Sequence, residues 1–545
     1  MPHALSIPAS GFQAVILCGP GSSFPTFTAN PDENPKALIP IANRPMVWYP
    51  IEFCYRMGIT NITLITPYSS ASAITAALNT NPHLTSLPLP KPNILAPENL
   101  DQNTGTAEIF RLQQVRDLIT GDFIVLPCDL VCEIGGESLL ESWMVREAKI
   151  EDPNEQGFLT GNRKSESPEK VWRRGGLGVW YETKRDVVIK DEETDFIATS
   201  PLELGPILPS KSSILSHISS LIYSIPTDSL RDLLEDKKSF PVRHGLIRSN
   251  PRIRMLSSHR DAHIYIFPAW VLDMINGNEH MDSIGEDVIG WWAKARWQEG
   301  LKEKLGLGEI FTKHDPGSPD EHSYSTNPEC YTNFGSLSTT WTSELKIAEA
   351  NRADSSQVPP ILAYLHPKTG KLIRRVDTAS LLLATSLQLA KLDSIDVTGK
   401  DNSSPFAHQN KIAHPDGIAP RTTVTRADCL IAENVTVEEK SSIKECVIGA
   451  NCHIKGGAKL LRCILMDGVV VGKGCKLTGC ILGKRCEIGE ESILQDCEVQ
   501  ENLFIEPRTE DKNNKLMSSE GMETTEEDFQ VLTADDPGTE IGLPS

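Results

Sequence analysis

The chain has 545 residues, of which 39% are hydrophobic and 23% are charged, and its 53 basic and 73 acidic residues give a formal net charge of −20. This length predicts at least two domains, because single hydrophobic cores rarely grow beyond roughly 250–300 residues. The acidic balance argues against broad non-specific nucleic-acid binding. We expect neither a secretory signal nor a membrane helix, so the 13 cysteines predict reduced thiols in the cytosol.

Apolar runs alternate with helical patterns along the first three hundred residues. Strands are predicted at 12–17, 61–66, 94–96, 122–130 and 261–267. Helices are predicted at 44–58, 104–120 and 282–297, the last with Ser283 and Glu286 in capping-box spacing. This alternation indicates a mostly parallel sheet covered by helices. The polar stretches at about 151–170, 190–215 and 314–360 are interpreted as loops or insertions.

The second half of the chain contains an internal repeat. Five cysteines stand 17 positions apart, at Cys429, Cys446, Cys463, Cys480 and Cys497. Aliphatic residues recur every six positions within each period, and glycines stand beside many of them. This pattern is typical of the hexapeptide repeats of a parallel β-helix, in which each aliphatic residue points into the shaft and glycine relieves the tight corners.

The repeat sets the division of the chain into domains. We place the sheet domain at 11–392, a linker at 393–423 and the β-helix at 424–505. Residues 506–545 are rich in Glu, Asp, Thr and Ser, and they predict a disordered acidic tail. The cysteine ladder itself permits a metal or disulfide interpretation, but buried, inert thiols filling one stripe of the shaft are the favoured interpretation.

A glycine turn after the first strand indicates a phosphate-handling loop. In "LCGPGSSFPTFT" (17–28), Gly19, Gly21 and Ser22 offer backbone N–H groups that could cradle phosphates. Lys36 in "NPKALIP" could contact a phosphate, and Asp129, at the end of an apolar strand, could hold a metal ion. No arginine stands between Leu17 and Lys36, although arginine is the residue best suited to neutralise a leaving pyrophosphate.

Loop and repeat together resemble the nucleotidyltransferase family of sugar-phosphate pyrophosphorylases, whose loop has the pattern G-x-G-T-R-L-x-P-L-T and is later followed by K-P. "GPGSSFPTFT" (19–28) keeps both glycines, but Ser23 stands where the family has its catalytic arginine. Ala37 follows Lys36 where the family has proline. Asp129 in "LPCDLV" matches the metal aspartate of the family. Loss of the arginine counts against turnover, because comparable deletions cost roughly 10²–10³ in rate.

The resemblance implies an α/β fold: a Rossmann-like, nucleotidyltransferase-type mixed sheet domain with insertions, followed by a left-handed parallel β-helix. One branch of this family with such a decayed loop comprises the gamma subunits of eukaryotic translation initiation factor 2B. The motifs "SFPTFT", "LPCDLV", "RDAHIYIF" and "SIGEDVI" resemble that branch. We therefore expect no catalytic residue, no metal ligand and no cofactor, and we expect Gly19, Gly21, Ser22, Lys36 and Asp129 to form a vestigial nucleotide-binding site.

This resemblance also implies partners and a cellular role. The chain would be a non-catalytic subunit of the guanine-nucleotide exchange factor for initiation factor 2, in a cytosolic complex with the epsilon subunit and the other subunits of initiation factor 2B. It would act on GDP-bound initiation factor 2, without direct contact to nucleic acid or membrane. Two alternatives stay open: an active nucleotidyltransferase of the mannose-1-phosphate guanylyltransferase type, and an inactive paralogue that regulates an active pyrophosphorylase.

Overall fold

The computed structural model describes residues 11–100, 103–150, 174–183, 189, 192–202, 213–240, 242–250, 252–313, 358–399 and 403–518, of which 145–150 and 312–313 are described by their backbone only. The chain divides into two compact units, residues 1–409 and 410–545, and each is described by itself. In these stretches, no helix has both the length and the apolar character needed to cross a bilayer.

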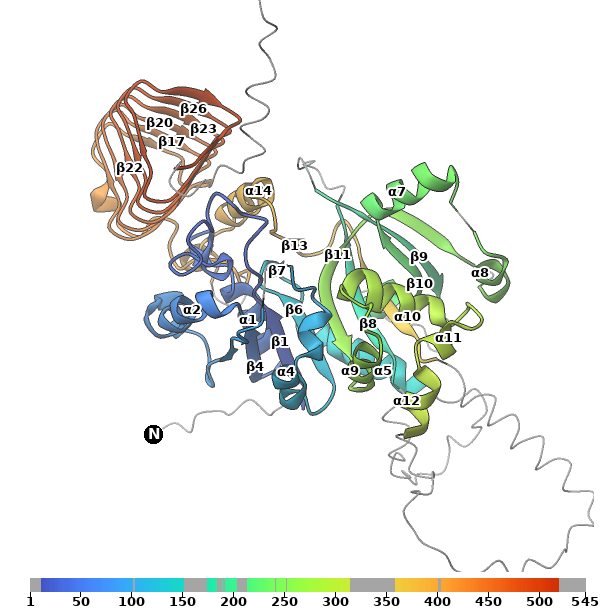
Figure 1. Ribbon diagram of the computed structural model, residues 1–545. Coiled ribbons are helices and arrows are strands. Elements are labelled where there is room, and N and C mark those ends of the chain that lie inside the picture. The colour runs from blue at the N-terminus through green and yellow to red at the C-terminus, as the bar shows by residue number, and fades with distance from the viewer. Residues whose placement is uncertain are drawn as a thin grey trace, which may run out of the picture. The chain divides into compact units, whose positions relative to one another are not determined.

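The first unit is built on a twisted sheet to which the described residues contribute nine strands (Figure 1). Their order across the sheet is β5 (Asn93–Leu95), β4 (Asn61–Ile65), β1 (Gln13–Leu17), β6 (Phe123–Pro127), β11 (Arg254–Phe267), β8 (Gly176–Glu182), β12 (Ile361–His366), β10 (Ile218–Pro226) and β9 (Asp195–Pro201). Strands β5, β4, β1 and β6 are parallel, whereas β11 runs antiparallel to both β6 and β8. The sheet is therefore mixed: its first four strands are parallel, as the alternation predicts, and beyond them β8 and β12 form a further parallel pair among antiparallel neighbours.

Helices flank the sheet and supply the core between the layers. They are α1 (Trp48–Arg56), α2 (Tyr68–Thr80), α3 (Pro82–Thr85), α4 (Gln113–Leu118), α5 (Gly136–Ile150), α7 (Thr227–Lys237), α8 (His244–Ser249), α9 (Trp270–Gly277), α10 (Ile289–Ala295), α11 (Leu301–Lys304), α12 (Leu307–Lys313), α14 (Ala379–Ala390) and α15 (Ile395–Thr398). One buried cluster joins Val15 and Phe123 of the parallel strands to Trp270 and Trp292 of α9 and α10. This cluster holds the two halves of the sheet domain together, because it buries aromatic and aliphatic side chains from both.

Two predicted elements differ from the structure. The helix expected at 104–120 is a 3₁₀ turn, Glu108–Arg111, followed by the short α4, since Leu112 between them has extended backbone angles. The stretch 190–215, interpreted as a loop, contains β9, which pairs antiparallel with β10 on one side and with the first part of β11 on the other. The seven residues of β9, DFIATSP, contain a single short apolar run, so their sequence pattern is weaker than that of β1 or β6.

Strand β11 carries a bulge that matters for the site. Its pairing with β8 shifts register between Asp261 and Tyr265, and His263 at the centre has φ of +52°. A positive φ at a non-glycine residue costs energy and persists only where the surroundings enforce it. The bulge lets β11 present Asp261, His263 and Tyr265 at the cavity walls described below.

The second unit is a left-handed β-helix with three parallel faces. The first face comprises β14 (Thr423–Val424), β17 (Ser442–Lys444), β20 (Lys459–Leu461), β23 (Lys476–Thr478), β26 (Ile493–Gln495) and β29 (Glu510–Lys512). The second comprises β15 (Leu430–Ile431), β18 (Val447–Ile448), β21 (Ile464–Leu465), β24 (Ile481–Leu482), β27 (Glu498–Val499) and β30 (Lys515–Leu516). The third comprises β16 (Thr436–Val437), β19 (His453–Ile454), β22 (Val470–Val471), β25 (Glu487–Ile488) and β28 (Phe504–Ile505).

The shaft of the β-helix is filled as the repeat predicts. Ile448, Leu465 and Leu482 stack on successive coils and are almost fully buried. The five cysteines of the ladder are buried and unpaired, and the thiol of Cys463 donates a hydrogen bond to the Leu461 carbonyl at 3.2 Å. Burial raises the pKa of the Cys452 thiol, which lies elsewhere in the same shaft, to about 12, so this thiol stays protonated and unreactive at neutral pH.

The corners follow the prediction that glycine relieves them only in part. Gly457 and Gly474 adopt positive φ at one corner, but Lys440, Glu491 and Arg508 occupy the equivalent positions on other coils. These residues accept the left-handed conformation although their Cβ atoms disfavour it. Stacking of neighbouring coils therefore enforces the corner geometry even where the sequence supplies no glycine.

Strands of the β-helix extend beyond the bounds predicted for it. Ile412 and Ile418, in the predicted linker, form parallel bridges with Ile431 and Val437 of the first coil. At the other end, β29 and β30 continue to Leu516. Asp511 occupies the position that Leu494 holds one coil earlier. This polar residue interrupts the six-residue aliphatic pattern, so the pattern does not predict the last coil.

The linker also packs partly on the sheet domain. The guanidinium of Arg44, itself buried, donates hydrogen bonds to the carbonyls of Phe406 and Ala407, both at 2.8 Å. A charge-assisted pair of this kind is stronger than a neutral hydrogen bond. The stretch from Ser403 to His408 therefore belongs to the first unit rather than to a free connection.

We predict that stability of the β-helix depends on the inward position and hardly on its neighbour. Leu494→Ala empties a shaft site that is 1% exposed, and such core truncations cost roughly 2–5 kcal/mol. Ile493→Ala, one residue away and 36% exposed, should cost less than about 1 kcal/mol. Thiol labelling of Cys480 and Cys497 in urea measures opening of these coils, and equal labelling rates in the two variants would contradict the assignment of the shaft.

Candidate functional site

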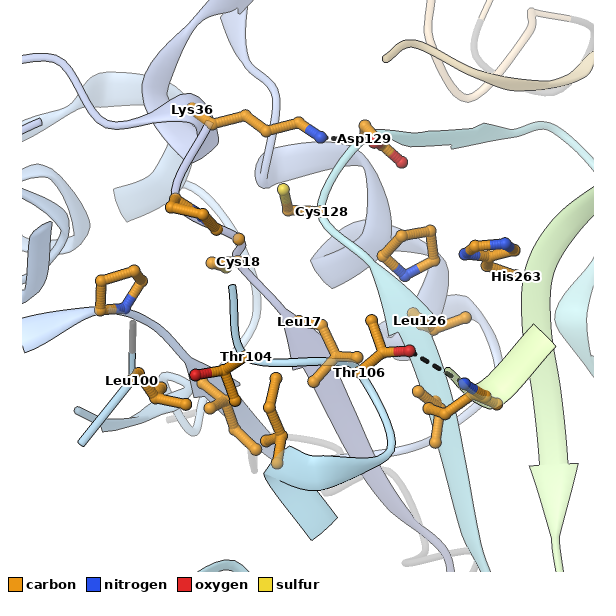
Figure 2. Close-up of a pocket in the computed structure, with 18 of the residues that line it drawn as sticks. Leu17, Cys18, Lys36, Leu100, Thr104, Thr106, Leu126, Cys128, Asp129 and His263 are labelled. Atoms are coloured by element: carbon orange, nitrogen blue, oxygen red, sulfur yellow. Dashed lines mark hydrogen bonds and ion pairs between the residues drawn. The ribbon is translucent and has the colours of Figure 1, made fainter. Parts of the chain in front are cut away.

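A cavity of about 200 Å³ lies where the parallel strands β1 and β6 end (Figure 2). Open α/β sheets bind ligands at this edge, because the loops after the strands diverge there. Its walls combine aliphatic side chains with a few polar groups from distant parts of the sequence. The lining residues are Leu17, Cys18, Gly19, Pro20, Lys36, Ile65, Pro67, Leu100, Thr104, Thr106, Ile109, Val125, Leu126, Pro127, Cys128, Asp129, His263, Tyr265, Ile284 and Arg375.

A buried ion pair joins Lys36 and Asp129 across the top of this cavity. Lys36 Nζ lies 2.7 Å from Asp129 Oδ2, and Figure 2 shows the two side chains pointing at one another. The lysine side chain is 12% exposed and the aspartate 2%. Burial by itself would raise the pKa of the Asp129 carboxyl, but Lys36 and Arg375 together hold it well below its usual value. Asp129 is therefore ionised and compensated by positive charge.

A second cation reaches the same carboxylate from a distant segment. Arg375, at the end of β13 (Ile373–Arg375), places Nε 3.5 Å from Asp129 Oδ1 and a terminal nitrogen 3.5 Å from Asp377. Neither Asp129 Oδ1 nor Arg375 Nε has a hydrogen-bond partner in the described part of the chain, so this contact is an ion pair without hydrogen-bond alignment. Arg260 pairs with the same Asp377 oxygen, Oδ2, at 2.5 Å. Two guanidinium groups thus converge on one oxygen of Asp377.

His263 completes this cluster as a neutral imidazole. Its Nε2 lies 3.1 Å from the Arg375 guanidinium, which can only donate, so Nε2 accepts. Burial and the neighbouring Arg375 hold the pKa of His263 well below its usual value. The bulge in β11 is the cause of this placement, because a regular strand would direct residue 263 differently.

Short local elements set the position of each charged group. Lys36 opens a 3₁₀ turn, Lys36–Leu38, which is followed by the small ladder of β2 (Pro40–Ile41) and β3 (Arg44–Pro45). Asp129 stands between β6 and β7 (Leu130–Cys132), and β7 pairs antiparallel with β13. That ladder carries Arg375 to Asp129, because Arg375 is in register with Leu130.

The glycine loop is only partly at the cavity. Gly19 lines it together with Lys36 and Asp129, whereas Gly21 and Ser22 are not among its lining residues. Gly21 has φ of +94°, and its carbonyl accepts hydrogen bonds from the Phe24 N–H at 2.8 Å and the Thr28 hydroxyl at 2.9 Å. A Cβ at Gly21 would approach Thr28 Cγ2 to 2.8 Å. Gly21 therefore closes a turn within the loop, and Ser22 is exposed.

Sequence reasoning missed Arg375 and His263. The family pattern places its cation in the loop between Leu17 and Lys36, and Arg375 lies far beyond that loop in the chain. One signal was available, because "LIRRVD" places two arginines among aliphatic residues that predict a buried strand. A charged residue at a buried position needs a partner, which points to an ion-pair network.

The residues at Asp129 do not fit a divalent metal ion. Magnesium needs carboxylate oxygens that are free to coordinate it, together with phosphate or water oxygens. One Asp129 oxygen accepts from Lys36, and Arg375 lies next to the other. A dication at this position would meet two buried cations at short range, and no group of three or more His, Cys, Asp or Glu in the described stretches forms an alternative centre.

A second, more polar cavity of about 180 Å³ lies on the other side of His263 and Arg375, and Asp195, Asp261 and Glu286 are among its lining residues. Asp261 accepts from the Tyr265 hydroxyl and from the His263 backbone N–H, at 2.5 Å and 2.8 Å. Burial and the nearby Asp195 raise the pKa of Asp261 to about 7, although both hydrogen bonds act in the opposite direction.

Comparisons with known proteins agree with this geometry. The family model described as the left-handed β-helix domain of the epsilon subunit of initiation factor 2B matches residues 409–510. The chain is 26% identical over 298 residues to the translation initiation factor 2B gamma subunit of Schizosaccharomyces pombe, and this alignment covers 54% of each protein. The resemblance to the gamma subunit is confirmed. The chain is also 27% identical over 266 residues to the gamma subunit of Dictyostelium discoideum, or 48% of this chain and 52% of that protein.

The match to the gamma subunits has a defined extent. The aligned part of this chain spans about half the length of the curated relatives it matches. The family model carries the name of the epsilon subunit, but it covers the β-helix alone, whereas both relatives are gamma subunits and their matches are far longer than the β-helix. The longer matches therefore favour the gamma subunit over the epsilon subunit.

We predict that Lys36 is needed mainly to compensate Asp129. Lys36→Met should destabilise the sheet domain by roughly 3–5 kcal/mol, because it leaves a buried carboxylate with only the misaligned Arg375. The double variant Lys36→Met/Asp129→Asn should be more stable than Lys36→Met. Urea unfolding followed by tryptophan fluorescence measures this in the first unit alone, because all nine tryptophans lie before residue 342. A double variant weaker than Lys36→Met would contradict the pairing.

A pH dependence follows from Asp261. In the folded chain the Asp261 carboxyl keeps its proton up to about pH 7. In the unfolded chain the same carboxyl loses its proton near the ordinary pKa of aspartate. The folded state therefore binds more protons between these values, and stability contributed by Asp261 falls as pH rises through this window. The free energy of unfolding of the wild type should lose roughly 2–3 kcal/mol through Asp261 between about pH 5 and pH 8, and Asp261→Asn should remove this part of the pH dependence. Urea unfolding at both pH values tests this, and an unchanged pH profile would contradict it.

Proposed function

We propose that this chain is a non-catalytic subunit of the guanine-nucleotide exchange factor initiation factor 2B and promotes GDP/GTP exchange on initiation factor 2 together with the epsilon subunit. The observation that carries the proposal is the state of Asp129. The carboxylate that would hold a metal ion is buried and paired with Lys36 and Arg375. The similarity to two gamma subunits supports the same conclusion.

The site supports recognition rather than bond chemistry. Nucleotidyl transfer needs a cation aimed at the leaving pyrophosphate, and Ser23, which replaces the family arginine, is exposed and uncharged. The two cations that do lie at the cavity, Lys36 and Arg375, are already paired with Asp129 and Asp377. In this proposal Gly19, Lys36 and Asp129 remain as a vestigial nucleotide site, Gly21 and Ser22 shape the loop beside it, and no cofactor is required.

Exchange itself requires no covalent step. A factor accelerates GDP release by binding the nucleotide-free or distorted form of its target more tightly than the GDP-bound form, which shifts the population towards release. The described chain offers two rigid elements for such a role, the sheet domain and the β-helix. We place it in the cytoplasm, in a heteromeric complex with the epsilon subunit and the other subunits, with GDP-bound initiation factor 2 as the target.

A second candidate is an active nucleotidyltransferase. One observation favours it: Arg375 brings a guanidinium to the cavity that the loop itself lacks. If Arg375 left Asp129 when a nucleotide bound, it could take the role of the missing loop arginine. The third possibility, a regulatory pyrophosphorylase paralogue, requires an active pyrophosphorylase as the partner.

The proposal predicts no pyrophosphate release from GTP and mannose 1-phosphate. The purified chain and its Asp129→Asn variant should give the same background, because the wild type has no reaction for the variant to lose. The chain should co-purify with the epsilon subunit and with initiation factor 2. Release by the wild type that Asp129→Asn abolishes would establish the enzyme instead, and co-purification with an active pyrophosphorylase would establish the regulatory paralogue.

A further inference from the structure

The first face of the β-helix carries an unusual number of lysines. The middle residue of each three-residue strand points into the shaft, so the flanking residues point outward. We call the outward residues of β17, β20, β23, β26 and β29 the lysine face. It comprises Ser442, Lys444, Lys459, Leu461, Lys476, Thr478, Ile493, Gln495, Glu510 and Lys512.

The charges on this face are not compensated within the part of the chain that the structure describes. Four lysines and one glutamate stand on it, although the chain as a whole has a net charge of −20. Lys459 and Lys476 are directly opposite one another on adjacent strands. Like charges in this position destabilise a sheet. On another edge of the same β-helix, by contrast, Glu491 and Arg508 pair at 3.1 Å.

Apolar residues lie among the lysines. Leu461 is 40% exposed and Ile493 is 36% exposed, both on the lysine face. Exposed single aliphatic residues are ordinary, but here they combine with a row of unpaired ammonium groups on a rigid, flat surface. Such a surface suits a segment that carries several carboxylates together with a few apolar side chains.

The chain itself contains such a segment. Residues 519–545 hold eight acidic residues and neither lysine nor arginine, and "EEDFQVL" (526–532) sets three carboxylates beside Phe529, Val531 and Leu532. The segment is joined to the β-helix directly after β30. Its 27 residues reach much further than the roughly 24 Å that six strands at about 4.8 Å span. Covalent linkage also raises the effective concentration of the segment at the lysine face, to the millimolar range for short linkers.

We propose that the acidic segment 520–532 docks on the lysine face of the same chain. Its carboxylates compensate Lys444, Lys459 and Lys476, and its apolar residues cover Leu461 and Ile493. The segment thereby occupies this face, and another acidic ligand must displace it to bind there.

Cleavage of the full-length chain by a protease specific for glutamate tests the docking. The segment should be cut slowly at low ionic strength, and about tenfold faster in Lys459→Glu/Lys476→Glu, because the variant replaces attraction by repulsion. The matched control, Lys237→Glu/Lys238→Glu, makes the same charge change at exposed lysines of the first unit and should cleave like the wild type. Equal cleavage rates in all three proteins would overturn the proposal.

Zero-length carbodiimide cross-linking identifies the partner residues. The wild type should join Glu526, Glu527 or Asp528 to a lysine of the lysine face, and the yield at Lys444 should fall several-fold in Lys459→Glu/Lys476→Glu. The yield should survive dilution, because the contact lies within one chain. Cross-links to Lys237 or Lys238 instead, or links only between two chains that vanish on dilution, would overturn the proposal. Circular dichroism checks that the variants retain the fold, as expected for exposed positions.

Discussion

The sheet domain depends on one electrostatic constraint, which is that the buried Asp129 carboxylate must be compensated. Lys36 and Arg375 meet at this carboxylate from segments more than three hundred residues apart in the chain. A buried ion pair contributes little net stability compared with apolar packing, but removing one partner is costly. The network therefore ties the first loop, the end of β6 and the β7–β13 ladder together, and it fixes the chemical character of the cavity beneath.

That constraint also determines how the polar groups near the cavity are arranged. The cavity keeps its place at the ends of the parallel strands, and its walls are largely aliphatic. Several polar groups at the cavity or behind it pair with one another: Lys36 with Asp129, Arg375 with His263, and Arg260 with Asp377. Groups that are paired in this way are less available to a developing charge on a reacting phosphate.

The β-helix is stabilised in a different way, because each coil is stabilised only by its neighbours. Inward aliphatic residues and buried thiols form a continuous shaft, and stacking is strong enough to hold residues such as Arg508 in the left-handed conformation. The outward positions are free of that requirement. Their residue types are consequently free to be selected for binding. The lysine face is therefore the part of this domain that indicates a binding role.

The sequence by itself determined the elements whose signal is local. The six-residue period identified the β-helix, and the apolar runs identified β1, β4, β6 and β11, since shaft and central strands must bury their side chains. The resemblance of the loop placed Gly19, Lys36 and Asp129 at one site, and these three do line one cavity. Only the tertiary structure showed Arg375 and the bulge that brings His263 to it. Their roles arise from pairing across distant segments, and no local pattern in the chain records which buried charges meet.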